Sequence, residues 1–392
     1  MHGMANLGAA HKGYLYQDIA TAYCLATALV DGVGSLTVDY KYHPGDRFDD
    51  LCLFAVDGTC RRRQFKHSEG TVSFGKELLS TDRRDLQLSA LIRSWEADPV
   101  AVQAKEYRVC ATWTVPTEPD DLLQLTPTDV PGSFGDYPTK RFRLAVDKVW
   151  PQRGKPLLQC LRGLKRADLV AFARIFVLEL ECPTASSDLG HPGTLERLVA
   201  GVLGERVGFG QFPNEHRSPM AAAEKLVITA TQARIAGAGG DATKLTPAAI
   251  ASHVGLVTNY GRIPQQFPFW SDIFVAVPDL RRRLLNQVEA GGITVLAGKP
   301  GAGKSWELTA LTKTLRNQGA VVASHYCYLE PGDPEVQRRI TLNIFYGNLI
   351  AEILDALPGL RAKNIARYAA GPNELQALLA AAAELKPARR LV

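Results

Sequence analysis

The chain has 392 residues, of which 46% are apolar and 22% are charged, and its net charge at pH 7 is +5. This length predicts two or three domains, and the composition excludes wholesale disorder. No apolar run reaches the roughly 18 residues of a membrane span, and residues 1–10 lack a signal-peptide pattern. We therefore expect a cytoplasmic protein without membrane contact. Its seven cysteines form no CxxC pair and are predicted to be reduced core residues.

Hydrophobic periodicity predicts a mixed α/β fold at the start of the chain. One helical face is indicated by apolar residues at Leu15, Ile19, Ala22, Ala26 and Leu29. Alternating, β-rich segments follow it, and helical and strand-like segments come next. In chain order we expect a helix over 14–29, a strand over 36–42, a hairpin over 47–67, a helix near 76–95 and a strand over 107–115.

The middle of the chain carries fewer signals. Five prolines between residues 116 and 140 predict a long surface loop. The sequence RIFVLELECP is strand-like, whereas the glycine-rich sequence from Gly237 and PQQFPFW before residue 271 predict linkers. We expect one domain over 1–205, a helical connecting region over 206–270 and a second domain over 271–392.

Polar residues gather at the open end of the expected hairpin. A two-residue turn at Asp57-Gly58 would pair Leu51 with Gln64, and Asp49 with Lys66. Asp49, Gln64 and Lys66 would then share one face. Asp50 would join them only if a bulge shifted the register. The alternative is an ordinary hairpin whose polar ends meet water.

These residue types suit metal-dependent cleavage of phosphodiesters. A carboxylate, from Asp49 or Asp50, and the side-chain oxygen of Gln64 would hold Mg²⁺, and Lys66 would orient or deprotonate the attacking water. A basic cluster adjoins this set and is predicted to contact phosphates, although a solvated strand edge is the alternative reading. The cluster consists of Arg61, Arg62 and Arg63, with Arg83 and Arg84 nearby.

A phosphate-binding loop begins at Gly298. Residues 298–305 match G-x-x-x-x-G-K-[ST] without a mismatch, between the apolar segment ITVLA, expected as a buried strand, and a helical segment. Such a loop wraps phosphates with its backbone N–H groups, while Lys304 reaches the β and γ phosphates and Ser305 holds Mg²⁺. We therefore expect bound ATP. The contacting residues are predicted to be Gly298, Gly301, Ala302, Gly303, Lys304 and Ser305.

The acid of a Walker B strand, which organises magnesium and water, is not evident. Asp355 lies in a predicted helix, and Glu330 and Asp333 lie in a turn after the expected strand VVASHYCYL. The chain ends with ARRLV, whose last residues would begin such a strand. Because a domain ending mid-strand exposes an unpaired edge, we expect this chain to be the front part of a longer protein.

The P-loop, HYCYLEPGD and RRITLNIFYGNLIAEIL resemble the STAND class of NTPases, especially those that serve as bacterial antiviral sensors. The resemblance covers roughly residues 271–392 and makes this part the front of a P-loop α/β domain. It implies that protomers form a homo-oligomer with ATP when a C-terminal region, absent from this chain, senses a viral protein. It leaves hydrolysis of ATP open. His325 matches the family pattern, either as a phosphate sensor or as a packed residue at a strand end.

GYLYQ on the first helix, DDLCLF and RRRQFKH resemble the PD-(D/E)xK effector endonucleases of bacterial CBASS and STAND antiviral systems, relatives of Mrr-type restriction enzymes. The likeness covers about residues 13–115 and implies a restriction-endonuclease-like mixed sheet flanked by helices. Asp50 (or Asp49) and Gln64 would be metal ligands and Lys66 the catalytic lysine. The chain departs from the pattern at Asp39, where relatives often have a glutamate, and in lacking the leading proline. Gln17 is expected on the helix surface rather than at the metal.

Together the two resemblances imply an antiphage effector of the α/β multidomain class. Its N-terminal domain would be a Mg²⁺-dependent endonuclease that degrades double-stranded DNA under the control of ATP-dependent oligomerisation. The cluster Arg61–Arg63 would hold the DNA backbone, which predicts salt-dependent binding without sequence preference. The alternative is an ATP-binding regulatory scaffold whose N-terminal domain binds DNA or a protein partner without cleaving.

Overall fold

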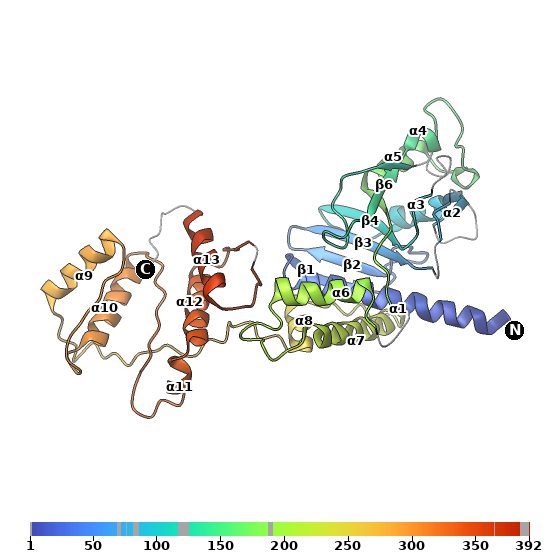
Figure 1. The fold of residues 1–392 in the computed structure, drawn as a ribbon. Helices are drawn as coiled ribbons and strands as arrows, with labels where there is room; N and C mark the ends of the chain where they lie inside the picture. Colours follow the sequence, from blue (N-terminus) through green and yellow to red (C-terminus); the bar gives the residue numbers. More distant parts are fainter. Residues whose placement is uncertain are drawn as a thin grey trace. The chain divides into compact units, whose positions relative to one another are not determined.

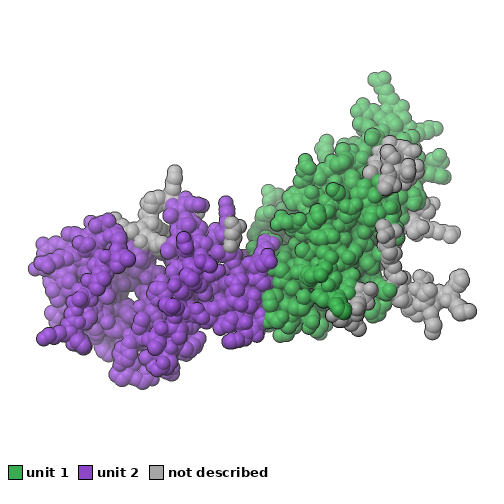
Figure 2. Space-filling model, viewed as in Figure 1, with its two compact units in different colours: residues 1–203, 218–256 green, residues 204–217, 257–392 purple. Residues whose placement is uncertain are grey.

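The computed structural model of the chain describes residues 2–68, 72–75, 77–80, 86–116, 125–186, 191–363, 365–384 and 392. The chain divides into two compact units, coloured green and purple in Figure 2. Unit 1 comprises residues 1–203 and 218–256, and unit 2 comprises residues 204–217 and 257–392. This division differs from the expected one, because most of the presumed connecting region belongs to unit 1.

Unit 1 is built on a seven-stranded mixed sheet with the strand order β1-β2-β3-β4-β7-β6-β5 (Figure 1). Strands β1, β2 and β3 are antiparallel to one another, β3, β4 and β7 are parallel, and β6 and β5 complete the sheet in antiparallel order. The strands are β1 Val33–Val38, β2 Leu51–Ala55, β3 Thr59–Lys66, β4 Ala104–Ala111, β5 Leu125–Pro127, β6 Lys140–Leu144 and β7 Phe176–Leu180. The expected α/β class with a mixed sheet is confirmed.

Helices cover both faces of this sheet. Figure 1 shows α1, α6, α7 and α8 on one side and α3 and α5 on the other. The predicted order of helix, three strands, helical stretch and strand is present at the start of the chain, with two helices, α2 and α3, where one was expected near 76–95. No described helix is long and apolar enough to cross a membrane. The helices of unit 1 are α1 His2–Ala28, α2 Glu77–Ser80, α3 Leu88–Ala97, α4 Val146–Val149, α5 Arg166–Ile175, α6 Thr194–Gly201, α7 Pro219–Ala238 and α8 Pro247–Val254, with a 3-10 turn at Gln159–Leu161 and a π turn at Val202–Val207.

One core of unit 1 lies between the sheet and helices α3 and α5. Its aromatic centre joins Phe48 to Tyr107 and Phe172 to Phe176, with ring centroids 4.9 Å apart in each pair. All four side chains are at most 1% exposed, and burying each contributes roughly 1.5–3 kcal/mol. Because Phe48 belongs to the loop before β2, this core anchors the loop that leads to Asp49 and Asp50.

Helix α7 crosses closely over β1. A Cβ atom on Gly237 would stand 2.0 Å from the carbonyl oxygen of Val38, so the approach requires glycine. Beyond the helix, Leu36 and Leu245 exchange two main-chain hydrogen bonds of 2.8 Å. The segment after Gly237, expected as a linker, therefore lies fixed against the sheet.

Unit 2 consists of helices around the P-loop, and its described residues form no regular strand. The segment 293–297, expected as a buried strand, is exposed: Ile293 is 97% and Val295 is 82% exposed, and no main-chain hydrogen bond pairs the segment with another described residue. This expectation is wrong because a buried strand requires neighbours on both sides. The helices are α9 Pro278–Ala290, α10 Lys304–Asn317, α11 Val336–Arg339, α12 Leu342–Ala356 and α13 Pro372–Glu384.

The segment 321–329, expected as a strand, makes one strand-like pairing. The N–H of Val392 donates to the carbonyl oxygen of Val321 at 2.8 Å, and the N–H of Ala323 donates to Val392 at 3.0 Å. Two hydrogen bonds that flank one residue in this way are the pattern of parallel strands. Residues 385–391, which precede Val392 in the segment predicted to begin a strand, lie outside the described residues.

Candidate functional site

The β2–β3 hairpin pairs one residue out of the expected register. Leu51 lies opposite Arg63, and Cys52 lies opposite Arg62, so Asp50 continues the ladder opposite Gln64. The predicted pairs of Leu51 with Gln64 and of Asp49 with Lys66 are therefore wrong. No bulge is needed to bring Asp50 to Gln64.

The turn explains the difference in register. Gly58 adopts a left-handed φ of +82°, and its N–H donates to the carbonyl oxygen of Ala55 at 3.2 Å. The Asp57 carboxylate accepts a hydrogen bond of 2.9 Å from the N–H of Thr59. A three-residue loop with glycine in the left-handed conformation takes the place of the predicted two-residue turn. A loop that is longer by one residue shifts the pairing of β2 with β3 by one residue. Each side chain of β3 then lies opposite a residue of β2 that was predicted to face the other side of the sheet.

Asp50 contacts the strand that carries the other two candidate residues. Its Oδ2 accepts a hydrogen bond of 2.6 Å from the N–H of Phe65, which lies between Gln64 and Lys66. Burial raises the pKa of Asp50 to about 7, although the Lys66 ammonium and the Phe65 N–H pull the pKa down. The structure thus places the Asp50 carboxylate beside the part of β3 that carries Lys66. Their roles as metal ligand and catalytic lysine stay predictions.

Two further carboxylates stand near Asp50. Its main-chain carbonyl oxygen accepts a hydrogen bond of 3.0 Å from the N–H of Asp39, and Asp39 has a left-handed φ of +48°. Burial, together with the Asp49 carboxylate, raises the pKa of Asp39. Burial also raises the pKa of Asp49, whose carboxylate lies 3.8 Å from Lys41 Nζ. Clustered acids with raised pKa values mark a functional-site candidate.

Gln64 has a buried side-chain oxygen that accepts no hydrogen bond from the described part of the chain. Its side chain is 6% exposed, and its Oε1 atom has no hydrogen-bond partner among the described residues. A buried acceptor without a partner costs roughly 1–3 kcal/mol, and a metal ion would remove that cost. In the continued ladder Gln64 shares its face with Asp50 and with Lys66, two residues further on.

Gln17 lies inside unit 1, so its expected place on the helix surface is wrong. It is 7% exposed because α1 packs against the sheet and against α7. Its side chain lies beside Asp39, and a hydrogen bond from Gln17 opposes the rise in the pKa of that carboxyl. The helical periodicity placed its apolar neighbours correctly but carried no sign that both faces of α1 are covered.

The oxygen ligands at the open end of the hairpin fit a Mg²⁺ ion only in part. Carboxylate and amide oxygens are the ligands that Mg²⁺ takes from proteins, and it keeps several waters; Asp50 and Gln64 offer one of each. Over the residues that the structure describes, no three His, Cys, Asp or Glu side chains are grouped closely enough to hold a metal ion by themselves. A site at the hairpin would therefore be one in which water and substrate complete the coordination.

Two of the three arginines expected to contact DNA are buried. Arg62 is 1% exposed and forms an ion pair with Asp46, with Asp98 Oδ2 4.0 Å from its Nε. Arg63 is 9% exposed, and its Nη1 lies 3.1 Å from Cys24 Sγ. This contradicts the prediction for both residues, because they face opposite sides of the strand and each side is covered. Arg61 remains partly exposed, and Arg83 and Arg84 lie outside the described residues.

The P-loop forms at the start of α10. Gly301 and Gly303 have left-handed φ angles of +77° and +79°, which only glycine adopts without strain. Lys304 begins the helix, and its Nζ donates hydrogen bonds of 2.8 Å to the carbonyl oxygens of Gly298 and Lys299. The predicted loop and helix are thus present, with the lysine folded back over the loop.

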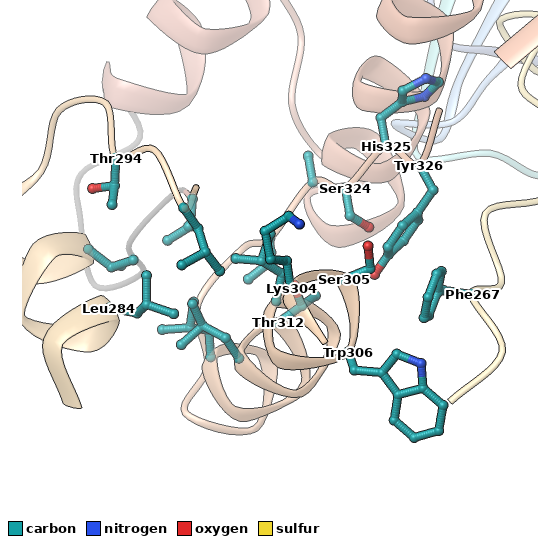
Figure 3. Close-up of a pocket in the computed structure, with 18 of the residues that line it drawn as sticks. Phe267, Leu284, Thr294, Lys304, Ser305, Trp306, Thr312, Ser324, His325 and Tyr326 are labelled. Carbon is teal, nitrogen blue, oxygen red and sulfur yellow. The ribbon is translucent and has the colours of Figure 1, made fainter. Parts of the chain in front are cut away.

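A large cavity opens beside this loop (Figure 3). Its volume is about 1380 Å³, and its lining includes Ala302, Gly303, Lys304 and Ser305. Figure 3 shows Lys304 and Ser305 at the start of one helix, with Tyr326 directed toward Ser305. A pocket of this kind beside a phosphate-binding loop offers room for a nucleotide.

His325 is packed rather than directed at the loop. Its Nε2 lies 2.8 Å from the carbonyl oxygen of Arg339, and Asn348 lies 2.9 Å from its Nδ1. The neighbouring Tyr326, which the sequence did not single out, hydrogen bonds Thr309 at 2.9 Å. Thr309 in turn donates to the carbonyl oxygen of Ser305 at 2.7 Å. The aromatic residue after His325 therefore contacts the P-loop helix.

None of the acids considered for a Walker B role lines the cavity as the structure describes it. Asp355 forms an ion pair with Arg262, and Asp333 forms one with Arg339. The Arg339 hydrogen bond lowers the pKa of Asp333. These carboxylates are engaged elsewhere in unit 2, so hydrolysis of a bound nucleotide has no assigned residue.

The chain matches no protein-family model, and a search of the curated proteins finds no match.

Proposed function

We propose that unit 1 is a Mg²⁺-dependent endonuclease that cleaves double-stranded DNA at the open end of the β2–β3 hairpin. The observation that supports this most directly is the position of Asp50 beside the part of β3 that carries Gln64 and Lys66. Asp50 hydrogen bonds the main chain between the other two, and the Gln64 Oε1 atom is buried without a partner. Such an arrangement is costly to fold and is therefore typical of a working site.

Each residue has a role in hydrolysis. Asp50 and the Gln64 Oε1 atom would hold the Mg²⁺ ion, which when bound polarises a phosphate and lowers the pKa of its water. Lys66 would orient the attacking water and stabilise the negative charge that develops on the phosphate. The water oxygen bonds to phosphorus, one phosphorus–oxygen bond of the backbone breaks, and the leaving oxygen takes a proton.

Unit 2 would control this activity through ATP. The P-loop of residues 298–305 provides a phosphate-binding site, and the resemblance of unit 2 to STAND NTPases suggests homo-oligomerisation when ATP is bound. A nuclease in a cell has to be kept inactive until it is needed, and a nucleotide-dependent assembly supplies two states. We propose that the chain acts in antiphage defence and is activated when a viral protein is sensed.

A plasmid cleavage assay with Mg²⁺ tests the nuclease proposal. Wild type is compared with Asp50→Ala and Lys66→Ala, and with Lys155→Ala as a control at an exposed site. We expect the control to cleave like wild type and the two site variants to lose at least about 100-fold in rate. If both site variants cleave as fast as wild type, the hairpin is not the active site. DNA binding that persists in a wild type that never cleaves would support the ATP-binding scaffold instead.

A further inference from the structure

Two cysteine side chains of the β2–β3 hairpin are in contact. Cys52 belongs to β2 and Cys60 to β3, and their Sγ atoms lie 3.2 Å apart. Both residues are free thiols and both are buried. A disulfide bond is about 2.0 Å long, so the two sulfurs would have to approach by only about 1.2 Å to form one. The function proposed above gives this pair no role.

The strand register places the two sulfurs on one face of the hairpin. Cys52 lies opposite Arg62, and Phe54 lies opposite Cys60. The two cysteines are therefore diagonal neighbours, because Cys60 is two residues from Arg62 and shares its face. In the register predicted from the sequence, Cys52 would lie opposite Arg63, and Cys60 would face the other side of the sheet. The contact between the thiols is thus a consequence of the observed register.

A metal site does not explain this pair of thiols. Structural zinc sites take four ligands from Cys, His, Asp and Glu side chains. The part of the chain that the structure describes contains no group of three or more such residues that could hold a metal ion. Two sulfurs are fewer than such a site requires, whereas a disulfide requires only two.

The folded hairpin holds the two sulfurs together before any bond forms. Gly58 has a left-handed φ of +82°, and the Asp57 carboxylate accepts a hydrogen bond of 2.9 Å from the Thr59 N–H, so the turn between the cysteines is fixed. In the unfolded chain the same two residues must first be brought together, which costs loop-closure entropy. We therefore expect a disulfide between Cys52 and Cys60 to form more favourably in the folded chain than in the unfolded one.

We propose that Cys52 and Cys60 are a reversible redox pair, which a small disulfide such as oxidised glutathione converts into a disulfide across the hairpin. One cysteine sulfur bonds to a glutathione sulfur, the glutathione S–S bond breaks, and one glutathione leaves as a thiol with the proton of that cysteine. The second cysteine sulfur then bonds to the first, and the other glutathione leaves as a thiol with the second proton. Two protein thiols are oxidised, and one glutathione disulfide is reduced to two thiols.

The proposed disulfide would connect the two strands that carry the proposed nuclease site. Cys60 shares a strand face with Gln64 and Lys66, since the three are separated by even numbers of residues. Because both sulfurs are buried, glutathione would reach them when the hairpin opens locally. The redox pair does not depend on the nuclease proposal, because it needs neither a metal ion nor DNA.

Redox equilibration of the full chain tests the proposal. The chain is incubated at set ratios of reduced to oxidised glutathione, in native buffer and in urea, starting from both the reduced and the oxidised protein. Free thiols are then blocked and the chain is digested with trypsin. Because trypsin cleaves after Arg47 and Arg61, both cysteines lie in the single peptide 48–61. In mass spectrometry the disulfide form of this peptide lacks two hydrogen atoms and carries no blocking group.

We expect the equilibrium constant for the disulfide to be at least tenfold larger in the folded chain than in urea. Cys327→Ser, which removes an exposed thiol outside the hairpin, is the matched control and should leave this constant unchanged. Cys60→Ser should abolish the disulfide form of peptide 48–61 in both conditions.

The possible results decide the redox pair independently of the plasmid assay. An equal or smaller constant in the folded chain would overturn the proposal, because the fold would then favour the two thiols and their contact would be ordinary core packing. A folded chain that stays reduced at every glutathione ratio would overturn it as well. A larger constant in the folded chain supports it, even if Asp50→Ala and Lys66→Ala cleave DNA like wild type.

Discussion

The Asp50 carboxylate accepts a hydrogen bond of 2.6 Å from the N–H of Phe65, the residue between Gln64 and Lys66. This bond connects the residue that precedes β2 to the last residue but one of β3. The proposed metal ligand and the proposed catalytic lysine are therefore held by one pair of neighbouring strands. A site on strands is positioned more accurately than a site on loops. The same bond holds Asp50 where burial raises its pKa to about 7.

Asp50→Asn should stabilise the metal-free protein increasingly as the pH rises. The folded protein keeps the Asp50 proton up to about pH 7, whereas the unfolded chain releases it near pH 4. Raising the pH between these values therefore favours unfolding of wild type. Three pKa units at about 1.4 kcal/mol each set an upper limit of about 4 kcal/mol for the gain at pH 8. Urea unfolding in EDTA measures this gain in stability, and hydrogen exchange of the main-chain amides of β2 and β3 measures it locally.

Asp57 provides the control within the same hairpin. The Thr59 N–H lowers the pKa of Asp57, so the stability that Asp57 contributes is lost as the pH falls rather than as it rises. Asp57→Asn should accordingly gain nothing between pH 5 and pH 8. A stability difference for Asp50→Asn that does not change over this range would contradict the raised pKa.

Gln64→Met should stabilise the metal-free protein while abolishing its response to magnesium. The substitution removes a buried acceptor that has no partner and keeps a similar volume, so a gain of about 1 kcal/mol is expected. It also removes a proposed metal ligand. Thermal unfolding with and without Mg²⁺ measures both effects. The more exposed Gln103→Met is the control, and a Gln64→Met variant that Mg²⁺ still stabilises like wild type would exclude Gln64 as a ligand.

The hairpin and its polar end could be predicted from the sequence, but its register could not. Alternating side chains around an Asp-Gly turn are a local signal. Two-residue and three-residue loops both use such a turn, and the choice between them depends on how Asp57 and Gly58 bond to their neighbours. That choice decides whether Asp49 or Asp50 lies opposite a given residue of β3.

The burial of Arg62 was equally invisible in the sequence. Three successive arginines are typical of a solvated surface, yet successive strand residues face opposite sides. The partner of Arg62 is Asp46, which belongs to the loop before β2. Only the packing of that loop against α3, through the bond from the Arg47 N–H to Ser94 at 2.9 Å, shows that the guanidinium is enclosed.

Arg62→Ala should destabilise unit 1 rather than weaken DNA binding directly. It would leave the buried Asp46 carboxylate without its cation, and removing one partner of a buried ion pair costs about 3–5 kcal/mol. Arg61→Ala, at the more exposed neighbouring position, should change stability by less than about 0.5 kcal/mol. Urea unfolding of both variants measures this. If Arg62→Ala is as stable as wild type and its DNA binding depends less on salt, the expected destabilisation is wrong. Arg62 would then contact the DNA backbone, as the sequence predicted.

Lys304→Ala should abolish the stabilisation of unit 2 by ATP. In the structure Lys304 Nζ bonds the carbonyl oxygens of Gly298 and Lys299, and nucleotide phosphates would compete for the same ammonium group. A ligand at 100 times its Kd stabilises the folded state by about 2.7 kcal/mol, and this shift should disappear in the variant. Thermal unfolding with and without Mg-ATP measures it. Lys299→Ala alters a lysine of the same loop outside the Gly-Lys-Ser triplet and should keep the shift. Unchanged ATP binding by Lys304→Ala would mean that the loop does not hold the nucleotide phosphates.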